Sequence, residues 1–355
     1  MNLNNTGPRI FIRRLIKSGV KLKKIELLNP DLKKIKDFKS VNKILIGRLD
    51  GAFYFDCTFI NLSQWLKFKN YYKLSKIFNF FSYLKSNKFT NKIFNFYLNR
   101  YSSWVLKNAK GLIFQSELSL KMHEKFLGFK KNKPFTIIHN GIDLNQFKPK
   151  KKNFVGTPAL LVSCSVYRPH KRLHEVIRLT NSLLKVYPKI KLHILGDLDI
   201  LTKEFVSQMD LSNCIFHGRI KPSQLPLYYC RCDIQVHLGI FDPCPNVVVE
   251  GLASGLPVVT PLQSGASELI GKKNIKWAVD EKIKMKYFET YNFKKIPKIP
   301  IEKYQKKIIK IFKNINHHKK IARKQAVENL DIKIVAIKYN NFFNQVTTNE
   351  RQRNK

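Results

Sequence analysis

The chain is poor in acidic side chains and lacks several signatures that would assign a function at once. Its 355 residues contain 24 Asp and Glu against 66 Lys and Arg, which gives a formal net charge of +42. It contains no GxGxxG loop, so the usual dinucleotide-binding fingerprint is missing. Its six cysteines form no CxxC pair, which argues against a zinc ribbon or a thioredoxin-type redox site.

Long apolar runs are also missing. The chain has no uninterrupted apolar stretch of about eighteen residues, so we expect no membrane-spanning helix. The first residues, MNLNNTGPRIFIRRL, lack the continuous apolar core of a secretory signal. The closest cysteine couple, Cys230 and Cys232, fits buried thiols in a reducing compartment better than a metal site. These features predict a cytoplasmic protein.

The excess of basic side chains has two explanations that composition leaves open. A surface with this charge attracts phosphate-rich partners, either an anionic membrane or nucleic acid. Lys, Asn, Ile and Phe are all abundant, however, and an A/T-rich genome produces that bias without any function. With 44% hydrophobic and 12% aromatic residues the chain should be globular, and its length suits two domains.

From Pro158 onward, apolar residues alternate between the spacing of strands and that of helices. Buried strands are expected in ALLVSCS, KLHILGD, IFHGRI, DIQVHLG and LPVVT, and helices in RLHEVIRLTNSLLKVY and SQLPLYYCR. This alternation predicts a parallel doubly wound sheet, which binds ligands at the carboxyl ends of its strands. The loops with Arg168, Gly196, Gly239 and Asp242 fall at those ends.

The segment that follows DIQVHLG predicts a short helix. Pro243 and Pro245 suit a first helical turn, and Gly255 with the following Leu-Pro pair ends the helix, which we expect over residues 246–254. The N-terminus of a helix offers unpaired N–H groups and a positive dipole end, which suit a diphosphate.

Two carboxylates, Asp242 and Glu250, lie eight residues apart in this segment. Eight residues make just over two helical turns, so both side chains can face one side of the helix. That spacing is typical of a sugar-nucleotide site. On the helix alone, two merely solvated carboxylates are an equally good explanation.

The first 150 residues give a weaker pattern. We expect a helix near residues 9–17 and strands in KILIGRLDG, GLIFQS and FTIIHNGID, with the first strand of the domain short or missing. Lysine-rich residues 148–153 are the expected linker. The predicted domains therefore cover residues 1–150 and 151–335, and residues 336–355 form a C-terminal helix or tail that can cross back to the first domain.

Residues 65–101 interleave aromatic residues with lysines and contain no acidic residue. A helix lying on an anionic membrane surface has this composition. An amphipathic helix packed inside the first domain has it too, and both interpretations stay open. Nucleic-acid binding needs the same ingredients, but no recognised binding module accompanies them, so we do not expect a nucleic-acid partner.

Three motifs resemble those of the two-domain glycosyltransferases of the GT-B fold, in particular the large retaining family 4. IIHNGIDLNQF resembles the junction between the domains, and SVYRPHKRLHEVI resembles the phosphate-binding segment. DPCPNVVVEGLASGLPVV resembles the E-x7-E segment, with Asp242 in place of the commoner first Glu. The resemblance implies an α/β architecture of two Rossmann-like, doubly wound domains that face each other across a cleft.

The resemblance implies a role for each matching side chain. Glu250 would accept hydrogen bonds from the two ribose hydroxyls of a nucleotide-sugar, which suits an acceptor-only carboxylate. Asp242 would hold hydroxyls of the transferred sugar, although it is one methylene shorter than Glu. Arg168 and Lys171 would neutralise the charge that develops on the departing diphosphate.

Further donor contacts follow from the same resemblance. The backbone N–H groups of Asn246 and Val247 would assist at the helix N-terminus. Gly196 and Arg219, at the ends of the second and third strands of this domain, are the other donor-binding candidates. By contrast, Arg172 is expected to be a solvated helix residue and Cys244 a packing residue.

The first domain fits the family less well. Many relatives place a His near the anomeric carbon, but the only candidate, His123, lies in mid-helix and is expected at the surface. The loop at residues 47–51 is the better candidate, since Arg48 or Asp50 can contact the acceptor there. We therefore take Asp50 as the catalytic candidate of this domain, with an ordinary turn as the equal alternative.

The sequence thus predicts a retaining glycosyltransferase that transfers a sugar from a nucleotide-sugar to a hydroxyl of a glycan or lipid-linked acceptor. No cofactor and no metal are expected, because Asp197 and Asp199 have DxD spacing but belong to a strand end that binds no metal in this family. The expected location is cytoplasmic, with peripheral contact at the inner membrane surface left open. The alternative is a non-catalytic GT-B-like protein that binds anionic membrane or nucleic acid.

Overall fold

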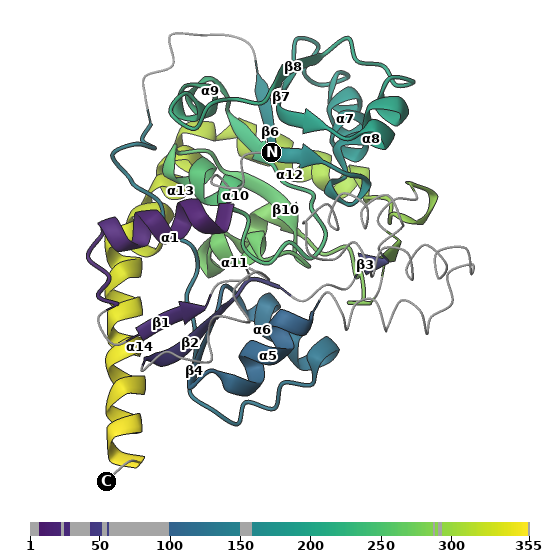
Figure 1. Cartoon of the computed structure of the whole chain (residues 1–355). Helices are drawn as coiled ribbons and strands as arrows, with labels where there is room; N and C mark the ends of the chain where they lie inside the picture. Colours follow the sequence, from purple (N-terminus) through teal and green to yellow (C-terminus); the bar gives the residue numbers. More distant parts are fainter. Residues whose placement is uncertain are drawn as a thin grey trace, which may run out of the picture.

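The computed structural model describes residues 7–22, 25–28, 43–51, 55–56, 99–149, 158–286, 288–289 and 293–353. Within these ranges the chain forms two larger parallel β-sheets that are packed between helices (Figure 1). The predicted α/β class is therefore confirmed. Residues 65–98, which carry nearly all of the aromatic and lysine pattern, and residues 150–153 of the linker lie outside the described residues.

The first sheet contains four parallel strands, which are β1 (Ile25–Leu28), β2 (Ile44–Leu49), β4 (Gly111–Phe114) and β5 (Phe135–Ile137), in that order. Alternate residues of the strands face opposite sides, so Leu112 and Ile113 enter different cores. One face is covered by α1 (Gly7–Lys17) and α14 (Ile332–Arg353), and the other by α5 (Arg100–Asn108) and α6 (Glu117–Leu127). The helix predicted at residues 9–17 is therefore confirmed.

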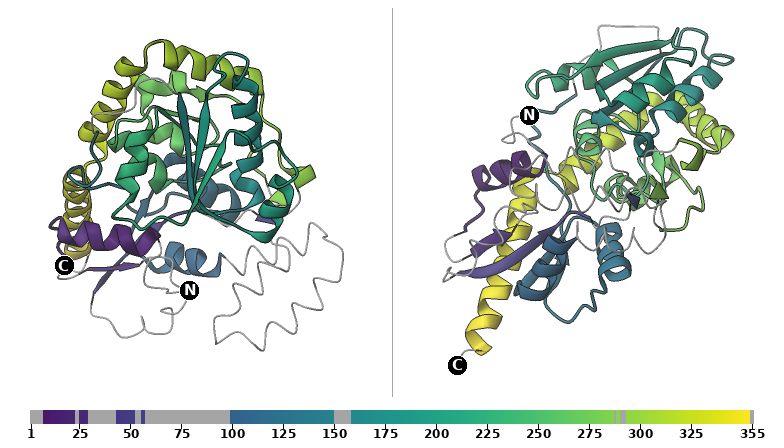
Figure 2. Two further views of the ribbon diagram at one scale, coloured as in Figure 1. Left: turned by 90° about the horizontal axis from the view of Figure 1, so that it is seen from above. Right: turned by 45° about the vertical axis from the view of Figure 1, so that its right-hand side comes forward.

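Helix α14 returns from the second half of the chain and packs against α1, as Figures 1 and 2 show in yellow and purple. The amide of Asn340 fixes the turn after α1, because its Oδ1 accepts from Lys21 N–H at 3.1 Å and its Nδ2 donates to Gly19 C=O at 3.1 Å. Phe11 and Tyr339 bury their rings between the two helices. The end of the chain is thus part of the core around the first sheet.

The second sheet contains six parallel strands in the order β11-β10-β9-β6-β7-β8. Their bounds are β6 (Ala159–Tyr167), β7 (Lys191–Leu198), β8 (Cys214–Gly218), β9 (Ile234–Val236), β10 (Val258–Pro261) and β11 (Ala278–Val279). The chain winds outward from β6 through β7 and β8, and then returns to the other side of β6 for β9 to β11. The doubly wound order predicted for this half is confirmed, with its switch point between β6 and β9.

Helices and short 3-10 segments connect these strands. They are η4 (Pro169–Lys171), α7 (Leu173–Leu183), α8 (Ile200–Val206), α9 (Leu225–Arg231), α10 (Asn246–Ala253), α11 (Ala266–Leu269), η5 (Lys272–Trp277), η6 (Phe293–Lys295), α12 (Ile301–Lys313) and α13 (Ile315–Asn329). Every strand and helix predicted after Pro158 occurs at its predicted position. One buried hydrophobic core unites the six strands and their helices.

Helix α10 begins and ends where its sequence predicts. The carbonyl of Pro245 accepts from Val248 N–H at 3.0 Å, which starts the first turn. Gly255 adopts a φ of +83°, a left-handed conformation that suits glycine, and Leu256 N–H closes the end on Gly251 C=O at 2.9 Å. A side chain at Gly251 would overlap Gln235 of β9, so this glycine lets α10 lie directly on the sheet.

The chain passes between the two halves at two adjacent places. Ile142 N–H donates to Leu330 C=O at 2.9 Å, and Ile332 N–H donates to Ile142 C=O at 3.0 Å. Gly141 is confined there, because a Cβ would lie 2.9 Å from the Cα of Ile332. A second backbone link is the parallel pairing of β3 (Phe55–Asp56) with β12 (Phe288–Glu289).

A carboxylate from the second half caps a helix of the first. Glu268 on α11 accepts from Glu117 N–H at 2.7 Å and from Leu118 N–H at 2.9 Å, both in the first turn of α6. Ser116 accepts from Ser119 N–H at 3.0 Å, so each of the first three N–H groups of α6 has an acceptor. A carboxylate is also favoured at the positive end of the helix dipole. Glu268 therefore joins the two halves through a helix terminus.

We expect Glu268→Ala to lower the free energy of unfolding by about 1–3 kcal/mol, because two N–H groups of α6 lose their acceptor. The matched control is Glu328→Ala, whose exposed carboxylate makes only a 3.7 Å ion pair with Lys324 and should change stability by less than about 0.5 kcal/mol. Urea unfolding of the two variants measures the difference. Equal losses would show that Glu268 does not hold the domains together.

Candidate functional site

The switch point of the second sheet brings two predicted site residues together. Segment η4 follows β6, and the loop before α10 follows β9, so both leave from the carboxyl ends of adjacent strands. Lys171 Nζ lies 2.7 Å from Asp242 Oδ2, across 71 positions of sequence. Their side chains are 23% and 16% exposed, so the pair lies at the edge of the protein interior.

Each member of this pair sets the charge of the other. Burial alone would lower the pKa of Lys171, but the Asp242 carboxylate outweighs it and leaves the pKa of Lys171 raised. Burial alone would raise the pKa of Asp242, but Lys171 and then His237 hold it below its usual value. Both side chains are therefore charged at neutral pH.

Arg168 supplies a second cation at the same edge. It lies just before η4 in extended backbone, and its carbonyl accepts from Lys171 N–H at 2.8 Å, which closes a tight turn. Its half-buried guanidinium forms no hydrogen bond or ion pair with the residues that the structure describes. Arg168 is thus available to an anion, whereas Lys171 is already neutralised by Asp242.

The N-terminus of α10 lies next in the chain after Asp242 and offers backbone donors. Val248 and Val249 donate to Pro245 C=O at 3.0 and 3.4 Å. Among the described residues, the N–H groups of Asn246 and Val247 have no acceptor, as the predicted diphosphate site requires. The side-chain Oδ1 of Asn246 accepts from Asn140 Nδ2 at 2.8 Å, which attaches α10 to the domain junction.

Glu250 lies in the middle of α10, where its side chain contacts Tyr229 of α9. Its side chain is only 7% exposed, and Tyr229 Oη donates to its Oε2 at 3.0 Å. Burial raises the pKa of Glu250 to about 7, although Arg14 of α1 and the Tyr229 hydroxyl partly oppose this. A hydrogen-bond donor that reaches Glu250, such as a hydroxyl of a ligand, would stabilise its ionised form.

Among the described residues, Gly196 and Arg219, two predicted donor-binding residues, contact other parts of the second domain instead of the Lys171–Asp242 pair. Gly196 on β7 adopts a φ of +121°, and a side chain there would overlap the backbone carbonyl of Cys164 on β6. Arg219 follows β8 and forms a 2.9 Å ion pair with Asp197. In the described part of the chain neither contacts the Lys171–Asp242 pair. Asp199, the other carboxylate of the DxD spacing, caps α8 by accepting from Thr202 N–H at 2.8 Å.

The loop at residues 47–51 belongs to a buried polar network. Asp50 accepts from Arg48 Nη1 at 2.6 Å and also from Gln115 Nε2. Arg48 is fully buried, donates to Asn140 Oδ1 at 2.9 Å and lies over the ring of Phe11. Burial raises the pKa of Asp50, and Arg48 opposes that shift without cancelling it. A continuous set of contacts thus runs from Asp50 through Arg48 and Asn140 to α10.

Two expectations about single residues are wrong. His123 is not at the surface: it is fully buried, its Nδ1 lies 2.7 Å from Ser119 C=O, and its ring packs edge-on against Phe114. Arg172 is not solvated, because both Nη atoms donate to the carboxylate of Glu281, at 2.9 and 2.7 Å. The left-handed backbone of Arg172, with a φ of 57°, turns its side chain inward.

His237 belongs to the site although its sequence context did not single it out. It follows β9, and its Nε2 lies 3.6 Å from Asp242 Oδ2. The one hint in the sequence was a single histidine in the largely apolar strand segment DIQVHLG. Cys244, expected as a packing residue, is buried and its Sγ accepts from Asn140 N–H at 3.3 Å.

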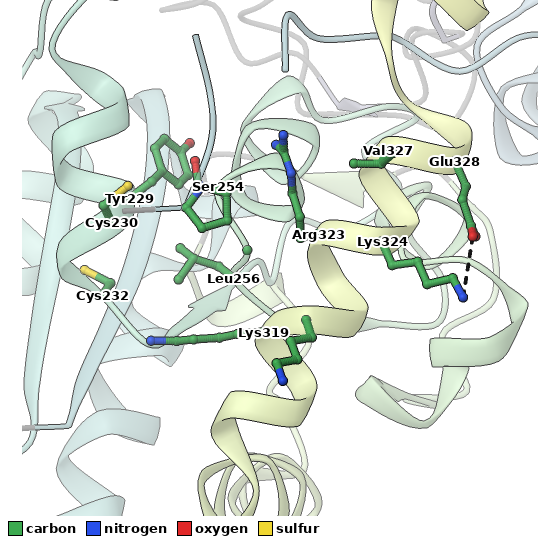
Figure 3. A pocket seen from close by; sticks show the side chains of 13 residues that line it. Tyr229, Cys230, Cys232, Ser254, Leu256, Lys319, Arg323, Lys324, Val327 and Glu328 are labelled. Carbon is green, nitrogen blue, oxygen red and sulfur yellow. Dashed lines mark ion pairs between the residues drawn. The ribbon is translucent and has the colours of Figure 1, made fainter. Parts of the chain in front are cut away.

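A separate pocket of about 460 Å³ lies between α13 and the C-terminal end of α10 (Figure 3). None of the predicted site residues lines it. Three of its four basic side chains, Lys319, Arg323 and Lys324, have partners among the described residues. Lys319 pairs with Asp233 at 2.8 Å, and Arg323 donates to the carbonyl of Phe147 at 2.7 Å. Lys324 pairs with Glu328 at 3.7 Å, as the dashed line in Figure 3 marks. Most of the positive charge of this pocket is therefore already engaged within the protein.

The described residues contain neither a metal-binding cluster nor a membrane span. No three His, Cys, Asp or Glu side chains among them lie together in a way that could hold a metal ion. None of the helices in the described ranges combines the length and apolar character needed to cross a bilayer. The described cysteines all carry free thiols.

Residues 145–291 match a family model described as "Glycosyl transferases group 1". The chain is 26% identical over 151 residues, 40% of its length and 37% of the relative's, to WcaL of Escherichia coli (strain K12), provisionally named a colanic acid biosynthesis glycosyltransferase. It is 30% identical over 116 residues, 32% of its length and 26% of the relative's, to alpha-monoglucosyldiacylglycerol synthase of Streptococcus pneumoniae (strain ATCC BAA-255 / R6). The chain thus spans between a quarter and two fifths of each curated relative.

The fold is also similar to that of solved structures. The crystal structure of Anabaena HepE in complex with UDP-glucose matches with a TM-score of 0.54 and 16% identity, over 85% of this chain and 72% of that one. At this identity the likeness concerns the fold alone. The predicted arrangement of two Rossmann-like domains, the GT-B fold, is confirmed.

Glu250→Gln tests the environment of this carboxyl. Because burial raises the pKa of Glu250 to about 7 from a reference of 4.5, its contribution to stability is present below about pH 4.5 and is lost as the pH rises through 7. We expect the variant to be more stable than the parent by roughly 1–3 kcal/mol at pH 8.5 and equal to it at pH 4.

Chemical unfolding at several pH values measures this difference, and Glu302→Gln on the exposed start of α12 is the control that should show no such pH dependence. A Glu250→Gln variant that is less stable than the parent at pH 8.5 would contradict the assignment of a raised pKa.

Proposed function

We propose that this chain, which carries a glycosyl transferases group 1 domain on the GT-B fold, is a retaining glycosyltransferase. It transfers a sugar from a nucleotide-sugar to a hydroxyl of a glycan or lipid-linked acceptor. The observation that carries the proposal is the meeting of Lys171 and Asp242 at the switch point of the second sheet. One side chain suits a diphosphate and the other suits sugar hydroxyls.

In the proposed diphosphate site, side-chain cations and backbone N–H groups supply the positive charge that a metal ion would otherwise supply. Arg168 has no ion-pair partner among the described residues, and the N–H groups of Asn246 and Val247 have no acceptor there. When the bond to the sugar breaks, negative charge develops on the departing nucleoside diphosphate. Fixed donors and cations aimed at that charge lower the barrier. This charge supply supports catalysis without a metal ion.

In the proposed complex Glu250 binds the ribose. Two hydroxyls that donate to its carboxylate favour the ionised form and offset part of the burial that raises its pKa to about 7. Tyr229 holds Oε2 in place through its 3.0 Å hydrogen bond. Asp242, one methylene shorter than Glu, holds hydroxyls of the sugar, so the choice of sugar depends on how this shorter side chain is held. Gly196 and Arg219 remain weaker candidates for donor contacts.

The acceptor is proposed to reach the site from the first domain, where Asp50 is the candidate contact. The names of the two relatives point to a polysaccharide in one case and to a diacylglycerol lipid in the other, which supports a glycan or a lipid-linked acceptor. The Anabaena protein of similar fold binds UDP-glucose, so a uridine diphosphate sugar is the first donor class to test. Retention of configuration is proposed from the motif resemblance within residues 137–271.

Calorimetric titration with nucleoside diphosphates tests the donor site. We expect the protein to bind one of them and Lys171→Ala to weaken that binding about tenfold and to slow sugar transfer by about 10²–10³, because a cation at the leaving group is lost. Lys324→Ala, which removes an exposed lysine of α13, is the control and should behave like the parent.

The proposal fails if the parent binds no nucleoside diphosphate, or if Lys171→Ala matches the control in both binding and transfer. Tight binding to anionic vesicles or DNA together with the absence of nucleotide binding would favour a non-catalytic role instead.

A further inference from the structure

His237 lies behind the Lys171–Asp242 pair at the end of β9. Its side chain is 6% exposed, and its Nε2 makes no hydrogen bond with any described residue. A buried ring nitrogen without a partner is costly, and in native proteins such a group calls for a specific explanation. Asp242 Oδ2 faces this nitrogen at 3.6 Å, which is slightly too long for a hydrogen bond.

The space between His237 and Asp242 is kept open by Gly239. A Cβ at this position would lie 3.1 Å from His237 Nε2 and 3.6 Å from Asp242 Oδ2. Since glycine has no Cβ, the two side chains face each other directly. A small rotation of the Asp242 carboxylate would shorten the distance to the normal range of a hydrogen bond, about 2.7–3.2 Å.

Lys171 has two competing partners in the proposed reaction. In the structure its ammonium is bound to Asp242 Oδ2 at 2.7 Å. A nucleoside diphosphate beside Arg168 and the N-terminus of α10 would attract the same ammonium. If Lys171 moves to the diphosphate, Asp242 becomes a buried carboxylate without a cation, which is strongly unfavourable unless another donor replaces it.

We propose that His237 is this replacement. When the donor binds, Lys171 leaves Asp242 for the diphosphate, and the His237 Nε2–H takes its place on Asp242 Oδ2. The carboxylate then stays ionised and correctly oriented, and its other oxygen accepts from a sugar hydroxyl. His237 is thus a positioning residue that acts through Asp242. This inference rests on the proposed function.

The charge state of His237 suits the exchange. Burial lowers the pKa of His237 to about 4, although Asp242 raises it and Lys171 lowers it further, so the imidazole is neutral at physiological pH. A neutral imidazole donates an N–H without placing a second cation beside Lys171. The titratable groups that act on Asp242 are Lys171, His237, His170 and the thiols of Cys164 and Cys244. Lys171 Nζ and His237 Nε2 lie 2.7 and 3.6 Å from Asp242 Oδ2 and are the two groups of the proposed exchange.

The test compares His237→Leu with His237→Gln and His237→Asn. Donor turnover is measured with UDP-glucose, UDP-N-acetylglucosamine and GDP-mannose, and the donor that the parent hydrolyses fastest is used for the variants. We expect His237→Leu to bind UDP about tenfold more weakly than the parent, because Asp242 is left without a donor when Lys171 moves to the diphosphate, and to lose about 10–100-fold in kcat. The acid limb of its kcat profile should move to higher pH, because Asp242 without a donor is easier to protonate.

The amide variants separate hydrogen bonding from packing. The Gln amide nitrogen extends about as far as Nε2 of His, whereas the Asn amide stops at the position of Nδ1. We therefore expect Gln to restore most of kcat and the position of the acid limb, and Asn to behave like Leu. This comparison remains informative if the Leu variant fails to fold, because both amides are polar.

The matched control is His174, which is also a buried histidine. Burial lowers the pKa of His174 to about 4, and its Nδ1 has no hydrogen-bond partner among the described residues. It lies on α7 against the rings of Phe205 and Phe293, so His174→Leu should leave the acid limb unchanged.

Two outcomes overturn the exchange while leaving the proposed function intact. In the first, His237→Leu keeps the kcat of the parent and the acid limb of its pH profile. In the second, His174→Leu shifts the acid limb as far as His237→Leu does. If the parent neither binds UDP nor turns over any of the three donors, the proposed function itself is wrong.

Discussion

The ion pair between Lys171 and Asp242 depends on the order of strands in the second sheet. Because β9 lies beside β6, the segment that follows each strand emerges at the same point of the sheet edge. Lys171 comes from one segment and Asp242 from the other, and α10 begins four residues after Asp242. Cations, carboxylates and free backbone N–H groups therefore gather at one place without any glycine-rich phosphate loop. The proposed donor chemistry follows from this topology rather than from a single motif.

Two polar connections join the domains in addition to their backbone links. Asp50, Arg48 and Asn140 form a continuous polar path from the first sheet to Asn246 of α10. On the other side, Glu268 follows β10 and caps α6 of the first domain. Both connections are hydrogen-bonded and charged, so they hold the domains in one orientation more specifically than apolar packing alone does. A change in the orientation of the first domain would change these contacts, so they couple its position to the start of α10.

Local features of the fold were predictable because their causes are local. The prolines and Gly255 set the bounds of α10 to within one residue, and the alternation of apolar residues located five of the six strands of the second sheet, all but β11. Arg168 and Lys171 were chosen from the resemblance of their segment to a phosphate-binding motif, and only the structure shows that Lys171 meets Asp242. Glu268 and Arg172 could not be placed, since their partners lie about 150 and 109 positions away. His237 escaped notice for the same reason as His123, because a single imidazole in an apolar segment gives no sign of what it faces.

In the proposed reaction, the diphosphate of a nucleotide-sugar takes Lys171 from Asp242 at the switch point of the second sheet. A crystal structure with bound UDP tests this exchange most directly, through the distance from Lys171 Nζ to Asp242 Oδ2, which is 2.7 Å in the present structure. We predict that this distance lengthens beyond about 4 Å, the limit of an ion pair, while Lys171 contacts a phosphate oxygen and Val247 N–H donates to the diphosphate. A bound UDP with Lys171 still paired to Asp242, or a UDP held elsewhere on the protein, would contradict it.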